Sequence, residues 1–174
     1  MIYLISGATH TGKTLYAQKI LEERKIPYLS LDHLKMGLIR TGYTDLTPAD
    51  DDELTPFLWP IAREMIKTAI ENSQHLTVEG CYIPFDWADD FEPEYLKEIR
   101  YHCLILTEDY IREHFETIIA TRSVIENRIK DPDLTIEALI LENRRYLEGC
   151  KRHSLDYILN PHLHERPGHS RPLP

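Results

Sequence analysis

A short segment near the start of the sequence constrains the fold of this chain more than any other feature. Gly7-Ala8-Thr9-His10-Thr11-Gly12-Lys13-Thr14 matches the pattern G-x-x-x-x-G-K-[ST] at every fixed position. The apolar residues 2–6 before it predict a strand, and residues 13–25 after it predict a helix. A glycine-rich turn in this place can hold a phosphate group, because backbone N–H groups and the start of the helix point at the anion.

The residue types in the segment are those that a bound nucleoside triphosphate needs. Lys13 would reach the β- and γ-phosphates, and the Thr14 hydroxyl would hold Mg²⁺. His10 stands at a variable position, where the backbone usually makes the contact, so we expect a passive role for its side chain. An ordinary glycine turn is the alternative interpretation. The predicted ligands are ATP and Mg²⁺, and the predicted nucleotide-binding residues are Gly7, Thr9, His10, Thr11, Gly12, Lys13 and Thr14.

Short apolar runs alternate with helical patterns along the rest of the chain, which is typical of βαβ units and a parallel sheet. Strands are predicted at 27–31, 75–80, 101–106 and 156–159, and helices at 32–40, 60–73, 107–130 and 135–153. The acidic run at 50–53 is interpreted as a solvated helix start, with a metal cluster as the alternative. In the helix that follows the glycine-rich segment, we expect Leu15, Ile20 and Leu21 to face the sheet. Asp32 is expected to cap the next helix.

Composition argues against several classes of partner. The 174 residues fit one domain, and a formal net charge of −9 disfavours nucleic acid and anionic lipid. No apolar run approaches the roughly 20 residues of a membrane span. The three cysteines form no C-x-x-C pair, and the histidines lack the spacing of a metal site. We therefore expect a cytoplasmic protein, monomeric or homodimeric, that acts on a small molecule.

The layout resembles the nucleoside monophosphate kinase-like group of small P-loop kinases, which includes adenylate, shikimate and gluconate kinases, chloramphenicol phosphotransferase and zeta-toxin-like kinases. The resemblance spans about residues 1–158 and rests on four features: the glycine-rich segment, an Asp after the second strand, Glu79-Gly80 after the third, and arginines before the last. It implies a three-layer α/β/α fold with a parallel sheet of about five strands, in order 2-3-1-4-5. It also implies a kinase domain over 1–160, a helical lid at about 120–146 and an irregular tail over 161–174.

The same resemblance assigns roles to two acids. In members that phosphorylate a hydroxyl, an acid at the position of Asp32 contacts the acceptor and can act as its base. Glu79 is expected to hold Mg²⁺ through water and, with Gly80, to lie beside the acceptor; an exposed strand end is the alternative for Glu79. Candidates for the wall of the acceptor pocket are Trp59, Cys81, Tyr82, Phe85 and Trp87.

Arginines from a lid can stabilise the charge that moves during phosphate transfer. Arg122 and Arg144 are the preferred pair, ahead of Arg128 and Arg145, although helix arginines more often pair with carboxylates in solvent. Arg40 stands at the end of the predicted helix at 32–40, where the following loop begins. It is the preferred residue to bind an anionic group on the acceptor.

Three functions fit these residues. The first is ATP-dependent phosphotransfer to a small-molecule acceptor, and the second is a nucleoside monophosphate kinase. The third is a nucleotide-dependent binding or regulatory module that transfers no phosphate. A guanine-reading GTPase is disfavoured, because the [NT]-K-x-D motif is absent from the sequence.

Overall fold

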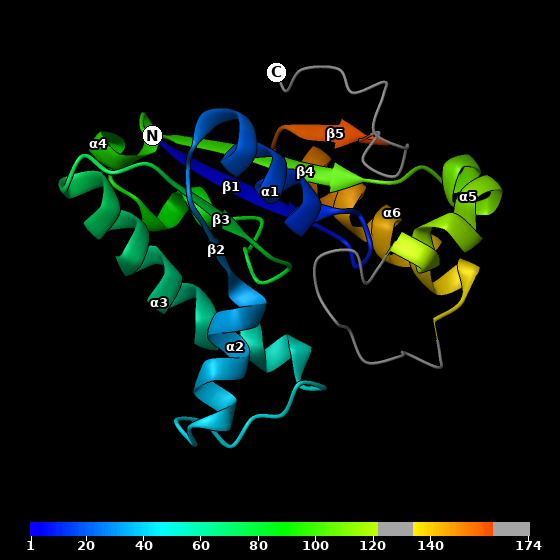
Figure 1. The fold of residues 1–174 in the computed structure, drawn as a ribbon, viewed down its shortest axis with the longest axis horizontal. Helices are drawn as coiled ribbons and strands as arrows, with labels where there is room; N and C mark the ends of the chain where they lie inside the picture. The colour runs from blue at the N-terminus through cyan, green and yellow to red at the C-terminus, as the bar shows by residue number, and fades with distance from the viewer. Residues whose placement is uncertain (122–133, 162–174) are drawn as a thin grey trace.

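A five-stranded parallel sheet lies at the centre of the computed structural model, which describes residues 1–121 and 134–161 (Figure 1). The strands run in the order β2-β3-β1-β4-β5, which confirms the predicted topology. Their bounds are Ile2–Gly7 (β1), Tyr28–Ser30 (β2), Leu76–Glu79 (β3), Ile99–Ile105 (β4) and Tyr157–Leu159 (β5). Because every neighbouring pair is parallel, the carboxyl ends of the strands meet at one edge of the sheet.

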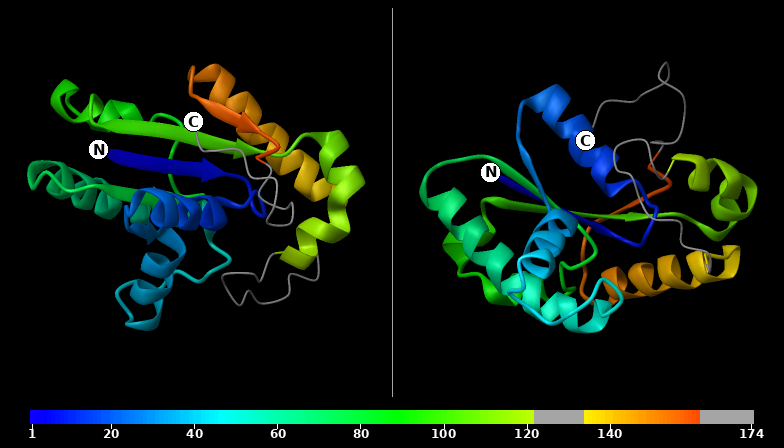
Figure 2. Two further views of the ribbon diagram at one scale, coloured as in Figure 1. Left: turned by 45° about the horizontal axis from the view of Figure 1, so that its top comes forward. Right: turned by 60° about the horizontal axis from the view of Figure 1, so that its bottom comes forward.

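Helices cover both faces of this sheet. Figure 2 shows α1 on one face and α3 and α6 on the other. The α-helices are Lys13–Arg24 (α1), Leu31–Arg40 (α2), Asp51–Glu71 (α3), Pro93–Leu96 (α4), Glu108–Thr121 (α5) and Ile136–Arg152 (α6), and a 3₁₀ helix, η1, spans Trp87–Asp90. None of the described helices is long and apolar enough to cross a bilayer.

The two faces of β1 bury alternate side chains. Ile2 and Leu4 belong to the large core under α3, whereas Tyr3 and Ile5 pack with α1. This alternation follows from the two-residue period of a strand, and burial on both faces explains why β1 is apolar throughout.

The buried side of α1 differs from the prediction. Ile20 is buried as expected, but Leu15 and Leu21 are only partly buried, and Tyr16 and Ala17 face inward instead. The glycine-rich loop sets this phase, because Lys13 must point into the loop. Residues three, four and seven positions later then lie on the same side of the helix.

The prediction that Asp32 caps α2 is wrong. The helix begins one residue earlier, with Ser30 at the cap position and no side-chain hydrogen bond there. Leu31 is fully buried, so its side chain joins the core as the chain leaves β2. Asp32 therefore lies in the first turn, where a carboxylate interacts favourably with the helix dipole.

α3 begins at Asp51, which confirms the interpretation of the acidic run at 50–53 as a helix start. It continues through Pro56 and Pro60 into the predicted helix at 60–73. Each proline removes a backbone donor, but the first half of α3 places Leu54 and Leu58 fully in the core. Burial of these side chains offsets the lost hydrogen bonds. The short helices η1 and α4, between β3 and β4, were not predicted.

Candidate active site at the phosphate loop

The glycine-rich segment forms a tight loop that joins β1 to α1. Gly7 has φ 145°, and a Cβ there would lie 2.4 Å from the carbonyl oxygen of Leu104 on β4. His10 and Gly12 adopt left-handed backbone conformations, with φ 63° and 85°. Such conformations within a loop that opens a helix turn several N–H groups toward one point, so the loop has the geometry of an anion site.

Lys13 lies inside this loop and is 6% exposed. Its Nζ donates to the carbonyl oxygen of Ala8 at 2.7 Å, and the Thr11 hydroxyl donates to the same oxygen at 2.9 Å. Among residues 1–121 and 134–161, no carboxylate forms an ion pair with this ammonium group. The loop therefore holds a buried positive charge at the place where phosphate oxygens would bind.

Thr14 and Glu79 form the second polar pair of the site. The Thr14 hydroxyl donates to Glu79 Oε1 at 3.3 Å, and both side chains are buried. The pairing of β1 with β3 places Ile5 opposite Glu79, which brings this carboxylate next to the start of α1. Hydroxyl and carboxylate oxygens are the hard ligands that Mg²⁺ prefers, so this donor set fits the ion.

Within the described residues, no group of three or more His, Cys, Asp or Glu side chains could hold a metal alone. The histidines of the tail beyond Pro161 lie outside the described residues.

The Mg²⁺ assignment can be tested with Glu79→Gln. Removing the carboxylate should raise the Mg²⁺ concentration needed for half-maximal ADP binding by roughly 10- to 100-fold. The amide spares the cost of burying a charge, so the free energy of unfolding should not fall. Calorimetric titration of ADP at graded Mg²⁺ measures the effect, with the exposed Glu94→Gln as control. An unchanged Mg²⁺ requirement would show that Glu79 holds no metal.

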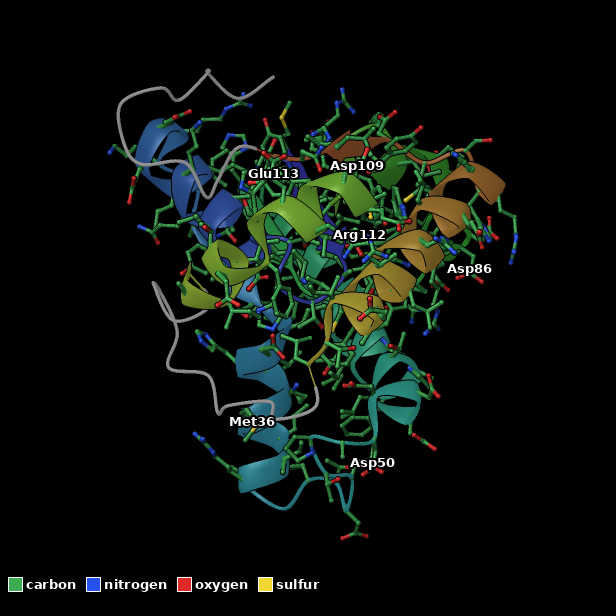
Figure 3. The ribbon with its side chains drawn as sticks, turned by 90° about the vertical axis from the view of Figure 1, so that its right-hand side faces the viewer. Met36, Asp50, Asp86, Asp109, Arg112 and Glu113 are labelled. Atoms are coloured by element: carbon green, nitrogen blue, oxygen red, sulfur yellow. The ribbon has the colours of Figure 1, made fainter. Side chains whose placement is uncertain are left out.

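A cavity of about 470 Å³ opens beside the loop. The phosphate loop contributes Thr9, the segment after β3 contributes residues 81–86, and α3 and α6 supply the remaining walls. Figure 3 shows α6 above the first turns of α3, with Asp86 labelled near α6 and Asp50 at the start of α3. The residues that line the cavity are Thr9, Asp51, Asp52, Thr55, Pro56, Cys81, Tyr82, Ile83, Pro84, Phe85, Asp86, Glu142, Arg145, Tyr146 and His153.

A chain of polar contacts links Asp32 to this cavity. Asp32 Oδ1 pairs with Lys35 at 2.8 Å, and Lys35 donates to the Tyr82 hydroxyl at 2.7 Å. That hydroxyl in turn donates to Asp51 Oδ1 at 2.8 Å. Burial, with nearby Cys81 and Asp51, raises the pKa of Tyr82 far above its usual value, so the phenol stays protonated and keeps this bond.

Gly80 brings the start of α2 close to the end of β3. Its φ is 155°, and a Cβ there would lie 2.8 Å from Leu31 Cβ. The close approach places Asp32, the next residue in α2, on the same edge of the sheet as Glu79. Burial raises the pKa of the neighbouring Cys81, so its side chain is a thiol at neutral pH rather than a thiolate.

The preferred arginines occupy different places. Arg144 is exposed and pairs with Glu108 at 3.2 Å, beside Arg112, which Figure 3 labels between α5 and α6. Its neighbour Arg145 lines the cavity instead. Arg40 is exposed in the last turn of α2 and does not line the cavity. Arg122 and Arg128 lie outside the described residues.

The candidate wall residues divide into two groups. Cys81, Tyr82 and Phe85 line the cavity. Trp59 and Trp87 are buried in the main core, where each ring packs against Phe91. The two tryptophans therefore support the fold rather than the pocket.

Sequence reasoning assigned no role to Glu142, which contacts the phosphate loop directly. Glu142 Oε1 accepts hydrogen bonds from the Thr9 backbone N–H at 2.9 Å and from the Thr9 hydroxyl at 3.2 Å. In the sequence, Glu142 is one of several acids in an amphipathic helix, and nothing distinguishes it from its neighbours. Only the packing of α6 reveals its role.

Two solved structures share the fold of this chain. Deoxyadenosine kinase from M. mycoides aligns over 91% of this chain and 89% of its own, with a TM-score of 0.54 and 13% identity. A candidate kinase from Chloroflexus aurantiacus aligns over 83% of this chain and 78% of its own, with a TM-score of 0.53 and 17% identity. The chain shares with them the α/β/α fold of P-loop NTPases. No protein-family model matches the sequence, and no curated protein does.

Within this fold, Asn143 fixes α6 to the sheet. Its side chain is buried, accepts from the backbone N–H of Leu106 at 2.8 Å and donates to the carbonyl oxygen of Leu139 at 2.9 Å. Asn143→Leu should leave the Leu106 N–H without a partner and lower the free energy of unfolding by about 2 kcal/mol. Urea unfolding measures this, with Asn72→Ala, an exposed amide that bonds Thr68, as control. Equal effects in both variants would argue against a buried anchor.

Proposed function

We propose that this chain is a Mg²⁺-dependent phosphotransferase that moves the γ-phosphate of ATP to a hydroxyl group of a small molecule. The supporting observation is one of geometry: the phosphate loop, with its buried Lys13 and its Thr14–Glu79 pair, opens onto a cavity. A donor site and a space for an acceptor thus adjoin, which is what in-line phosphate transfer requires.

The loop, Glu79 and Arg145 have separate parts in the proposed reaction. The loop amides would hold the phosphates, and Lys13 would follow the charge that develops on the transferred group. Thr14 and Glu79 would hold Mg²⁺, which would neutralise phosphate charge. Arg145, from the cavity wall, replaces Arg144 as our proposed contact to the transferred phosphate, because the guanidinium of Arg144 is engaged by Glu108.

The charge of the cavity favours an acceptor without an anionic group. Among the described residues that line the cavity, four are carboxylates, whereas Arg145 and His153 are the basic side chains. The carboxylates belong to Asp51, Asp52, Asp86 and Glu142. An acceptor with its own phosphate or carboxylate would be repelled, so an uncharged polyol or an amino alcohol fits better. This counts against the nucleoside monophosphate kinase alternative.

We propose Asp32 as the base that accepts the hydroxyl proton. It lies at the start of α2, beside the carboxyl edge of the sheet, and its partner Lys35 contacts Tyr82 of the cavity wall. A carboxylate within reach of the acceptor hydroxyl can take its proton as the phosphorus–oxygen bond forms.

The test is MgATP consumption with acceptors matched in size and different in charge. Glucose, glucosamine, glucuronate and glucose 6-phosphate form one set, and nucleosides with their monophosphates form another. The proposal expects turnover with an uncharged or amine-bearing member of such a set. Turnover with the anionic members alone would overturn the acceptor assignment, and MgATP binding without turnover by any acceptor would favour a regulatory module.

A further inference from the structure

A carboxylate that is distant in the sequence accepts hydrogen bonds from the phosphate loop. Glu142 Oε1 accepts from both the backbone N–H and the hydroxyl of Thr9, at 2.9 and 3.2 Å. Thr9 stands within the G-x-x-x-x-G-K-[ST] segment, whose N–H groups are the donors of an anion site. The carboxylate therefore bonds to the loop in the way that a phosphate oxygen would.

We propose that Glu142 competes with the nucleotide phosphates for Thr9 and thereby sets the affinity of the loop for nucleotide. The Thr9 amide has one hydrogen and can make one strong bond at a time. A phosphate that approached this amide would also meet the negative charge of the carboxylate. Glu142 must leave Thr9 for the phosphate to bind there, and the cost of its release lowers the apparent affinity.

Two contacts of α6 fix the backbone of Glu142 beside the phosphate loop. The next residue, Asn143, anchors α6 to the backbone of Leu106. One turn later, the Tyr146 hydroxyl donates to the carbonyl oxygen of Cys81 at 3.1 Å. These two contacts hold α6 against the ends of β4 and β3, so the helix keeps the Glu142 side chain within reach of the loop.

The cavity provides a place for the released side chain. Glu142 lines it together with Arg145, the cationic residue one turn along the same helix face. Rotation of the Glu142 side chain away from Thr9 would keep the carboxylate in a polar space beside that guanidinium. Release therefore requires only a side-chain movement and leaves the anchors of α6 in place.

Three variants separate contact from charge. Glu142→Gln keeps the length and removes the charge, whereas Glu142→Asp keeps the charge and shortens the reach. Glu148→Gln is the control, because Glu148 is an exposed acid on the same helix and its substitution changes the net charge by the same amount. Each variant is titrated with MgADP and with inorganic pyrophosphate by calorimetry, and thermal unfolding is recorded alongside.

Loss of a charged competitor should tighten binding about tenfold in Glu142→Gln, and Glu142→Asp should tighten it several-fold. Glu148→Gln should leave the Kd within about twofold of the wild type. Equal Kd values for Glu142→Gln and Glu148→Gln, or weaker binding by both Glu142 variants, would overturn the inference. The inference rests on the proposed nucleotide site: if neither the wild type nor Glu142→Gln binds MgADP, that site is wrong, whereas tight binding unaffected by Glu142 rejects only the competition.

Discussion

Lys13→Met should reduce ATP-dependent phosphotransfer by about 10³-fold. In the folded protein the ammonium group is buried in the phosphate loop, and its bond to the Ala8 carbonyl holds it toward the centre of the loop. Methionine retains most of the apolar stem and removes the charge. Because in the proposed reaction that charge would follow the γ-phosphate during transfer, kcat should fall more than nucleotide affinity. Initial rates with saturating acceptor, together with MgATP calorimetry, separate the two effects.

Lys19→Met is the matched control. It removes a lysine from the same helix, where the partly buried side chain pairs with Glu23 at 3.8 Å. Its rate should stay within about twofold of the wild type, since a single i,i+4 ion pair on a helix contributes little. A Lys13→Met protein that folds and transfers phosphate at the wild-type rate would mean that the nucleotide binds elsewhere on the chain.

The fold was largely predictable because its strongest signals are local. An apolar strand, a glycine-rich loop and a helix follow one another within residues 2–25, and the alternation continues to β5. The strand order came from the resemblance, since pairing between distant strands leaves no mark on one sequence. The acidic run at 50–53 indicated the start of α3. That the helix continues through Pro56 and Pro60 has no local signal, because burial of Leu58 acts through the folded core.

The site residues that were predictable from the sequence are likewise those with local signals. The residues of the phosphate loop are contiguous, and Glu79 stands out as a carboxylate at the end of an apolar strand. The choice between Arg144 and Arg145 depended on the rotation of α6, which Asn143 fixes through its bond to Leu106. The helical pattern in the sequence does not reveal that rotation, because the two arginines are adjacent and equally polar.

Asp32→Asn should lower kcat by about 10²- to 10³-fold and leave the affinity for MgATP unchanged. Asparagine matches the size of the side chain but does not accept a proton at neutral pH. The loss of the pair with Lys35, which stands at 2.8 Å between partly exposed side chains, should cost about 1 kcal/mol of stability or less. A large fall in rate would therefore reflect chemistry rather than unfolding. Calorimetry with MgATP and initial rates over a range of acceptor concentrations measure both quantities.

The control is Asp45→Asn, which removes an exposed acid from the loop after α2 and should not change the rate of phosphate transfer. If Asp32→Asn transfers phosphate as fast as the wild type, the acceptor hydroxyl loses its proton to another group or directly to the phosphate. Catalysis would then depend on positioning and charge in the loop alone. If the rate falls while KM for the acceptor is unchanged, Asp32 acts in the transition state and not in acceptor binding, which is the behaviour of a base.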